Sequence, residues 1–189
     1  PRHVGIMPAR NKAARTKVMR ALEVDDPVLL DAWHEAKREA EGASHLVRDS
    51  GRFPLCGRGD VNTYSVLSEH NRQSIAGTGR AGFIVPTGIA TDHTTRFFFR
   101  ILVESRTLAA LYGFENEEHL FKDVHNAFKF ALLVVTGAER TTPEADLVFF
   151  ARQVDDLLRT DRHFVLSLDD FALLNPNTRT CPTFRWQRD

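Results

Sequence analysis

The segment that decides the fold runs from Asp60 to Val135: DVNTYSVLSEHNRQSIAGTGRAGFIVPTGIATDHTTRFFFRILVESRTLAALYGFENEEHLFKDVHNAFKFALLVV. Helix-forming stretches alternate in it with short apolar runs that are bounded by Gly, Pro and Thr. The pattern predicts helices over 62–76 and 92–104, a turn at 77–79, and strands over 80–86, 107–114 and 129–136. Helices that alternate with buried strands are typical of an α/β domain.

The residues in and around each predicted strand indicate where that strand lies in the sheet. The run 80–86 (RAGFIVP) is short and almost entirely apolar, which is typical of a central strand in a parallel sheet. The connection from 107–114 to 129–136 is too short for the usual crossover helix, so an antiparallel pair is expected. Residues 146–151 (DLVFFA) are expected to add an edge strand, and 167–174 (SLDDFALL) resembles a capping box followed by a short helix.

The N-terminal region predicts a pair of helices. Residues 10–22 are rich in Ala, Lys and Arg. A second helix is expected over 28–48, because Asp25-Asp26-Pro27 supplies a cap and a proline for its first turn. Residues 1–22 carry six cations and no acid, which makes Lys12, Arg15 and Lys17 candidates for nucleic-acid contact. The alternative interpretation is an ordinary solvated helix face.

The overall composition limits the classes of function that the chain can have. The chain has 189 residues and a formal net charge of zero, so as a whole it has no polyanion-binding signature. Cys56 and Cys181 form no CxxC pair, which favours a reduced, cytoplasmic compartment. No apolar run approaches the roughly 18 residues that span a bilayer, and no signal peptide is visible. Because the chain begins with Pro rather than Met, we expect that an upstream part has been removed.

Four passages together resemble a known family. They are the passage GRAGFIVPT at 79–87, the pair Leu120-Phe121, the run KFALLV at 129–134 and the tail LNPNTRTCP at 174–182. Their order and spacing closely resemble the last half of the catalytic domain of an N6-adenine DNA methyltransferase. The match is to the large restriction-modification type, in which methylase and restriction endonuclease can share one polypeptide.

This resemblance implies a fold and a domain organisation. In class I methyltransferases the fifth strand follows a helix and a turn, and the last two strands form an antiparallel hairpin at the sheet edge. The implied fold is α/β: a partial class I, Rossmann-like methyltransferase sheet preceded by an α-helical hairpin. Residues 1–60 would be a helical insertion and loop, and 61–140 the carboxyl-terminal half of the domain. Residues 141–189 would add an edge strand, a short helix and a linker toward a missing target-recognition domain.

The chain departs from the family in the parts that perform catalysis. It has no Gly-rich cofactor loop and no Asn-Pro-Pro-aromatic motif, and Asn175-Pro176-Asn177 lacks the second Pro. We therefore expect no catalytic residue, no cofactor-binding residue and no bound S-adenosylmethionine in this chain. His119 and His125 lack the spacing of a helical zinc pair, so no metal site is expected either.

The resemblance implies three residues that bind the target base. Phe121 matches an aromatic residue that stacks on the extruded base, with Phe128 as an alternative, and Pro86 and Thr87 match the lining of the base pocket. The competing interpretations are a core aromatic for Phe121 and a simple strand terminator for Pro86.

Two functions follow from these observations. The first is a fragment of a DNA adenine-N6 methyltransferase whose parent transfers a methyl group from S-adenosylmethionine to an extruded adenine. Its partners would be DNA, the missing N-terminal half of the methylase domain, and a second copy that pairs through the exposed sheet. The alternative is a non-catalytic, methylase-like module that binds DNA or a partner through its basic N-terminal helix.

Overall fold

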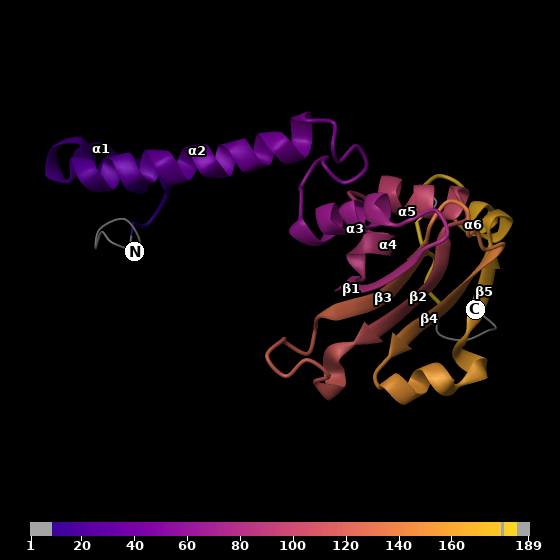
Figure 1. Ribbon diagram of the computed structural model, residues 1–189. Coiled ribbons are helices and arrows are strands. Elements are labelled where there is room, and N and C mark those ends of the chain that lie inside the picture. Colours follow the sequence, from indigo (N-terminus) through magenta and orange to yellow (C-terminus); the bar gives the residue numbers. More distant parts are fainter. Residues whose placement is uncertain (1–8, 179, 185–189) are drawn as a thin grey trace. The chain divides into compact units, whose positions relative to one another are not determined.

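The computed structural model describes residues 9–178 and 180–184, and the chain divides into two compact units, residues 1–52 and 53–189 (Figure 1). The first unit contains helices α1 (Lys12–Asp25) and α2 (Pro27–Asp49). The side chain of Asp26 accepts a hydrogen bond from the Leu29 amide at 3.0 Å, and Pro27 is the first helical residue. The tandem helices and the start of the second one are as the sequence predicts.

The second unit is a mixed α/β domain. In chain order its elements are α3 (Thr63–Ser74), β1 (Arg80–Pro86), α4 (Gly88–Thr91), α5 (Arg96–Glu104), β2 (Leu108–Glu115), β3 (Lys129–Thr136), β4 (Glu144–Ala151), β5 (Phe164–Ser167) and α6 (Leu168–Leu174). Short 3₁₀ turns follow β2 (Asn116–Glu118) and β4 (Val154–Leu158 and Thr160–Arg162).

The sheet has five strands in the order β1-β3-β2-β4-β5. Strand β3 is antiparallel to both β1 and β2, β4 is parallel to β2, and β5 is antiparallel to β4. The prediction that the first three strands are neighbours, with β3 antiparallel, is confirmed. Because β1, β2 and β4 run in the same direction, their carboxyl ends meet at one end of the sheet.

Three predictions about the sheet were wrong. Strand β1 is an edge strand rather than a central one, and only alternate side chains of it are covered, with Ile84 53% exposed. The β2–β3 hairpin lies inside the sheet rather than at its edge. Strand β4 is an interior strand because the short β5, which the sequence analysis missed, pairs with its outer side; Leu147, Val148 and Phe149 are all buried.

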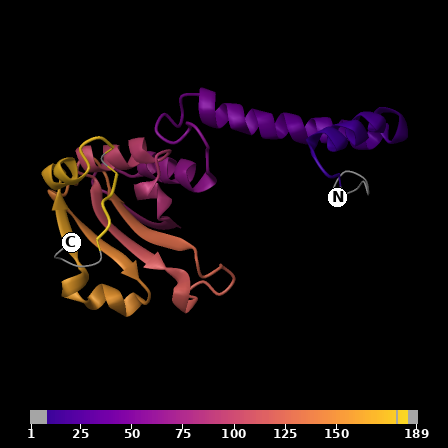
Figure 2. The ribbon, with the colours of Figure 1, turned by 180° about the vertical axis from the view of Figure 1, so that it is seen from behind.

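Helices α5 and α6 pack on one face of the sheet (Figures 1 and 2). The helix predicted over 92–104 begins only at Arg96, because residues 88–91 form the separate turn α4 and Asp92 closes it. The buried face of α5 is therefore Phe98, Phe99, Leu102 and Val103. Phe97 and Ile101 lie outside this buried face, and both are only partly buried.

Helix α6 confirms the capping box that the sequence predicts. The Ser167 hydroxyl accepts a hydrogen bond from the Asp170 amide at 3.3 Å, and the Asp170 carboxylate accepts one from the Ser167 amide at 2.8 Å. The reciprocal bonds satisfy two backbone donors that a helix start leaves unpaired. They fix α6 so that Phe171 is buried against Phe99, with ring centroids 5.8 Å apart.

Candidate functional site

A pocket of about 240 Å³ lies where the strands β1, β2 and β4 end. We call it the strand-end pocket; its lining residues are Thr87, Thr91, Gly113, Phe114, Glu115, Lys129, Phe149, Phe150 and Thr183. Thr87 follows β1 directly, Glu115 is the last residue of β2, and Phe150 is near the end of β4. In α/β sheets ligands bind outside the carboxyl ends of parallel strands, so this is the position where the fold favours a ligand.

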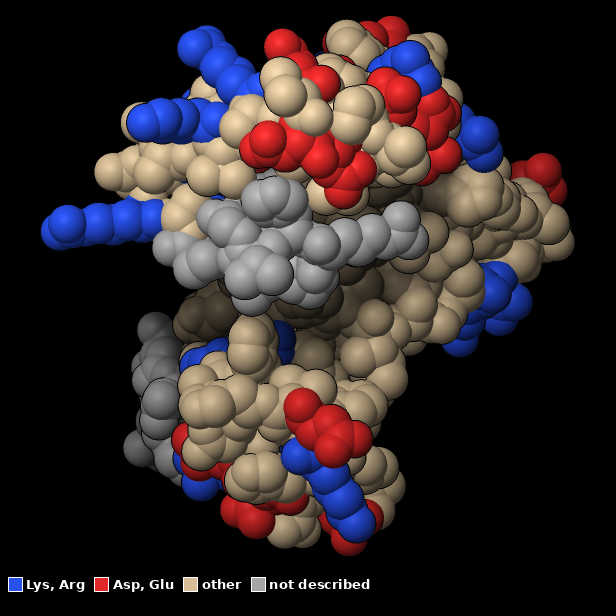
Figure 3. Space-filling model, turned by 90° about the vertical axis from the view of Figure 1, so that its left-hand side faces the viewer, with Lys and Arg blue, Asp and Glu red and all other residues tan. Residues whose placement is uncertain are grey.

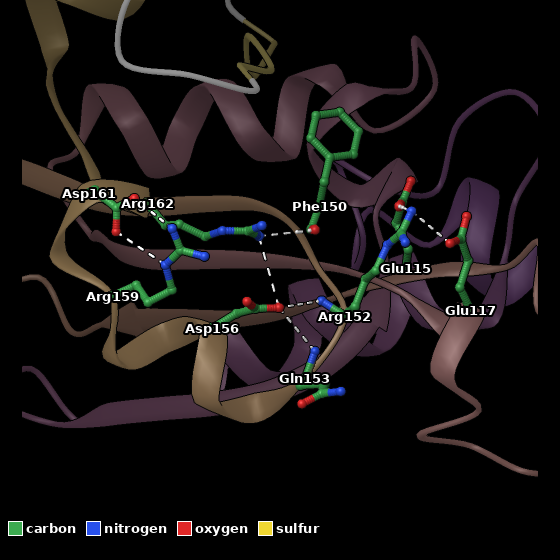
Figure 4. A network of polar contacts seen from close by, with 9 residues as sticks. All are labelled: Glu115, Glu117, Phe150, Arg152, Gln153, Asp156, Arg159, Asp161 and Arg162. Atoms are coloured by element: carbon green, nitrogen blue, oxygen red, sulfur yellow. Dashed lines mark hydrogen bonds and ion pairs between the residues drawn. The ribbon is translucent and has the colours of Figure 1, made fainter.

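Glu115 is the central charge of the pocket. It is 8% exposed, and its carboxylate lies 2.9 Å from Lys129 Nζ and 3.5 Å from Arg152 Nη2. The hydrogen bond from Lys129 lowers the pKa of the Glu115 carboxyl below its ordinary value, against the opposing effect of burial, and the Arg152 charge adds to it. Arg152 also pairs with Glu117 at 2.6 Å, and Figure 4 shows both acids facing the Arg152 guanidinium. Glu115 is thus an ionised, already paired acceptor rather than a proton donor.

Phe150 has an unusual backbone for an aromatic residue. Its φ is 55°, in the left-handed region that bulky residues rarely adopt. The pairing between β2 and β4 shifts register at this point, so Phe114 lies opposite Ala151. The bulge places the Phe150 ring in the lining of the pocket, where Lys129 Nζ lies 5.1 Å from its centroid. Such a conformation costs about 1–3 kcal/mol and persists only where the surroundings fix it.

A polar network around β4 supplies that fixation (Figure 4). Arg162 Nη1 donates to the Phe150 carbonyl oxygen at 3.2 Å and lies 3.9 Å from the Asp156 carboxylate. The same carboxylate accepts hydrogen bonds from the Arg152 amide at 2.8 Å and the Gln153 amide at 3.1 Å. These backbone bonds, with the Arg152 amide foremost, lower the pKa of Asp156. The sequence alone does not reveal this network, because the turn that carries Arg162 meets the end of β4 only in the folded chain.

The structure brings one predicted site residue into the pocket. Thr87 lines it, and the Thr87 amide donates to the Lys129 carbonyl oxygen at 3.3 Å. Pro86 ends β1 and lies opposite Phe130 across the β1–β3 ladder, where its side chain is exposed.

Phe121 lies outside the strand-end pocket, in the loop 116–128 between β2 and β3. Its ring is 41% exposed and contacts Phe130 edge-on, with centroids 4.9 Å apart, while Phe130 stacks on Phe114 at 5.1 Å. Phe128, the alternative, is 64% exposed. Both residues are thus partly open to solvent, and Phe121 also packs against Phe130.

A single buried amide organises this loop. Asn116 is 0% exposed, and its Nδ2 donates to the carbonyl oxygens of Phe121 and Val124 at 3.0 and 2.8 Å. Its Oδ1 accepts from the Phe121 amide at 3.0 Å. The three bonds satisfy the amide and hold Phe121 in a defined place despite its exposure.

The predicted nucleic-acid contacts lie in the first unit. Lys12, Arg15 and Lys17 are exposed on α1. Arg2, from the same basic run, lies outside the described residues. Figure 3 shows one face of the molecule, on which Lys and Arg side chains project singly and a group of Asp and Glu side chains lies near them.

The remaining reactive side chains serve the fold. Cys56 and Cys181 are free and buried, and burial raises the pKa of both thiols. The carboxylate of Glu69 is also buried, and it accepts hydrogen bonds from the Leu55 and Cys56 amides at 3.1 and 2.8 Å.

Within the described residues, no three or more His, Cys, Asp or Glu side chains gather as metal ligands would. None of the helices in that part of the chain is both long and apolar enough to cross a bilayer.

Comparison with known proteins bears on the fold. No protein-family model matches the chain, and no curated protein matches it. Among solved structures, the chain is similar to the crystal structure of the type I restriction-modification system methyltransferase subunit from Streptococcus thermophilus. The TM-score is 0.53 at 13% identity, and the likeness covers 75% of this chain and 35% of that one. At this identity the likeness shows a methyltransferase-like α/β fold, with an open five-stranded sheet, and the chain spans about a third of that subunit.

Proposed function

We propose that this chain is part of a DNA adenine-N6 methyltransferase from a restriction-modification system, and that it supplies the carboxyl-terminal half of the catalytic sheet. The observation that carries the proposal is the sheet order β1-β3-β2 with β3 antiparallel to both neighbours, in a fold that resembles a restriction-modification methyltransferase subunit over 75% of the chain. The parent enzyme would transfer a methyl group from S-adenosylmethionine to an adenine that is extruded from the duplex.

In this proposal the chain contributes to base binding but not to cofactor binding. Thr87 and Pro86 at the end of β1, and Phe121 on its ordered loop, would contact the extruded base. An exposed aromatic face suits this role, because stacking requires access to the ring. The described residues do not fit S-adenosylmethionine: no Gly-rich turn follows β1 or β2, and Glu115, the acid at the end of β2, is already paired with Lys129. The cofactor would bind to the other half of the domain.

The outer edge of β1 is where that other half would pack. Within the described residues β1 pairs with β3 alone, and Ile84 is exposed on it. Unpaired strand edges recruit further strands, so the isolated chain is expected to bind the missing half or a second copy. Light scattering should detect self-association that Ile84→Lys reduces, whereas Val165→Lys on the far edge strand β5 is the matched control. A strict monomer at high concentration would argue for a self-contained module.

Calorimetry tests the assignment of roles. The isolated chain should show no binding of S-adenosylmethionine, and the polypeptide encoded by the complete gene should bind it. Micromolar binding by the isolated chain would contradict the proposed division of the domain.

A second candidate is a non-catalytic, methylase-like module that binds DNA or a partner. The exposed basic side chains of α1 favour it. Triple replacement of Lys12, Arg15 and Lys17 by Gln should then abolish binding of a labelled duplex, with Arg38→Gln on α2 as a control. The module is the better account if this binding is lost while the complete gene product binds no S-adenosylmethionine.

A further inference from the structure

Two arginines share one aromatic ring on the second unit. The guanidinium carbon Cζ of Arg96 lies 4.5 Å from the centroid of the Phe97 ring, and that of Arg58 lies 5.1 Å from it. Arg96 is the first residue of α5, whereas Arg58 comes from the loop between Arg52 and α3. Phe97 is only partly buried, and its ring lies against two cations that are distant in sequence.

Neither arginine has a carboxylate within ion-pair distance in the described part of the chain. Arg96 Nη1 donates to the His93 carbonyl oxygen at 3.2 Å, and neither guanidinium forms an ion pair with a described carboxylate. Arg100, one turn further along α5, is different, because its Nε lies 2.8 Å from Glu104 Oε1. The first turn of α5 holds no acidic residue, so Arg96 also adds a cation to the positive end of the helix. Two cations over one ring, at a helix end that is itself positive, would be stabilised by an anion.

The surroundings favour a small anion. Asp60 and Asp92 line a neighbouring polar hollow of about 320 Å³, together with Thr94 and Thr95. Their carboxylates would repel a ligand with several phosphates that extended into the hollow. A single phosphate group that contacts the two guanidiniums from outside avoids this repulsion. Planar guanidinium groups match the geometry of phosphate oxygens, and a ring that restricts their orientation lowers the entropy lost on binding.

We propose that Arg58 and Arg96, which both lie over the Phe97 ring, form a binding site for one phosphate group. We assign that phosphate to the backbone of DNA, an assignment that rests on the proposed function, whereas the anion site itself does not. Contacts of this kind position a protein on a duplex without reading its sequence.

Salt dependence of DNA binding tests the site in the full 189-residue chain. A short labelled duplex is titrated at several salt concentrations, and binding is followed by fluorescence anisotropy. Arg58→Gln and Arg96→Gln should each reduce the slope of log K against log salt, and the double variant should reduce it by about 0.9, because the site holds one phosphate. Arg100→Gln is the matched control and should leave the slope unchanged, because Arg100 is already paired with Glu104. Phe97→Leu keeps both charges and should weaken binding by misaligning them.

A second probe separates the possible sources of the phosphate. Inorganic phosphate is titrated while the arginine Nε signals are followed by nuclear magnetic resonance. Binding of phosphate without binding of the duplex would keep the site and identify a small phosphate compound as its ligand. Thermal melting shows whether each variant is folded. If a Gln variant is not folded, Arg58→Lys and Arg96→Lys replace it; they keep the positive charge and remove the planar guanidinium.

The proposal is overturned if the Arg58 and Arg96 variants match the wild-type chain with both probes, or if neither probe binds. An equal loss in Arg100→Gln would overturn it as well, because it would indicate a general charge effect. Neither measurement involves methyl transfer, so a failure of the proposed methyltransferase activity would leave the result standing.

Discussion

Arg162 donates a hydrogen bond from Nη1 to the carbonyl oxygen of Phe150, 3.2 Å away, and so ties the turn before β5 to the strained end of β4 (Figure 4). The bond fixes the residue whose ring lines the strand-end pocket. Sequence-distant contacts of this kind, rather than local propensity, determine the shape of the pocket.

Arg162→Met removes the guanidinium and keeps the aliphatic stem. The Phe150 carbonyl oxygen and the Asp156 carboxylate then lose a charged partner, so the free energy of unfolding should fall by about 1–2 kcal/mol, discounted for the partial exposure of the pair. Urea unfolding measures it. Arg159→Met is the control and should have no measurable effect, because Arg159 pairs with Asp161 at the exposed surface. Equal effects of the two variants would show that the network around Phe150 does not stabilise the fold.

Asn116→Ala removes the amide that organises the loop 116–128. The backbone groups of Phe121 and Val124 lose the partly buried hydrogen bonds that they form with Asn116, at a cost of about 1–3 kcal/mol. Amide hydrogen exchange should accelerate across 117–128, while β2 and β3 stay protected. Asn126→Ala, at an exposed position of the same loop, should leave exchange unchanged. Uniform acceleration over the whole domain would instead indicate a general loss of stability.

His163 makes stability depend on pH. Its Nδ1 lies 2.8 Å from Asp146 Oδ1 and its Nε2 lies 3.0 Å from the Leu157 carbonyl oxygen, so both nitrogens face acceptors and both bonds require the doubly protonated ring. Burial lowers the pKa of His163, but the hydrogen bonds to Asp146 and Leu157 and the Asp146 charge outweigh it, and the net direction is upward.

A histidine pKa that is raised in the folded state stabilises the protein fully below the unfolded value, which is about 6.5. That stability is lost as the pH rises through the folded value. The free energy of unfolding should therefore fall as the pH rises from about 6.5 through the pKa of His163 in the folded state, and His163→Gln should flatten the dependence. Asp146→Asn should flatten it in part. If the free energy of unfolding instead rises over the same pH range, or if its pH dependence is unchanged in His163→Gln, the charged form of His163 does not stabilise the fold.

Phe121 is tested in the polypeptide encoded by the complete gene. Stacking of one base on an aromatic ring is worth about 1–3 kcal/mol, so Phe121→Ala should slow single-turnover methylation about 5- to 150-fold. Phe121→Trp should retain most activity, because stacking requires a flat ring. Phe128→Ala serves as the comparison, since Phe128 is the other exposed aromatic of the loop. Loss of folding stability with normal methylation by the folded fraction would assign Phe121 a packing role.

The sequence predicts the elements whose signals are local. The bounds of β1 and β3 were predicted to the residue, and the capping box at Ser167 was recognised, because turn residues and caps mark both. The position of β1 at the edge could not be predicted, because a short apolar run looks the same in a central strand. Strand β5 has four residues and no periodicity to detect.

The candidate site was predicted only in part, for the same reason. Thr87 was found because it follows a recognisable strand. Glu115, Phe150 and Arg162 were missed, because the contacts that give them a role are non-local: a paired carboxylate, a bulge and a cation from a later turn. The start of α5 was misplaced, because the turn α4 was not recognised.

The most direct test of the methyltransferase assignment is to identify the reaction product of the polypeptide that the complete gene encodes. The full-length polypeptide is incubated with S-adenosylmethionine and unmethylated DNA, and the digested nucleosides are analysed by mass spectrometry. The assignment predicts N6-methyldeoxyadenosine that accumulates with time and is absent when the cofactor is omitted. No methylated nucleoside, or 5-methyldeoxycytidine in place of N6-methyldeoxyadenosine, would contradict it.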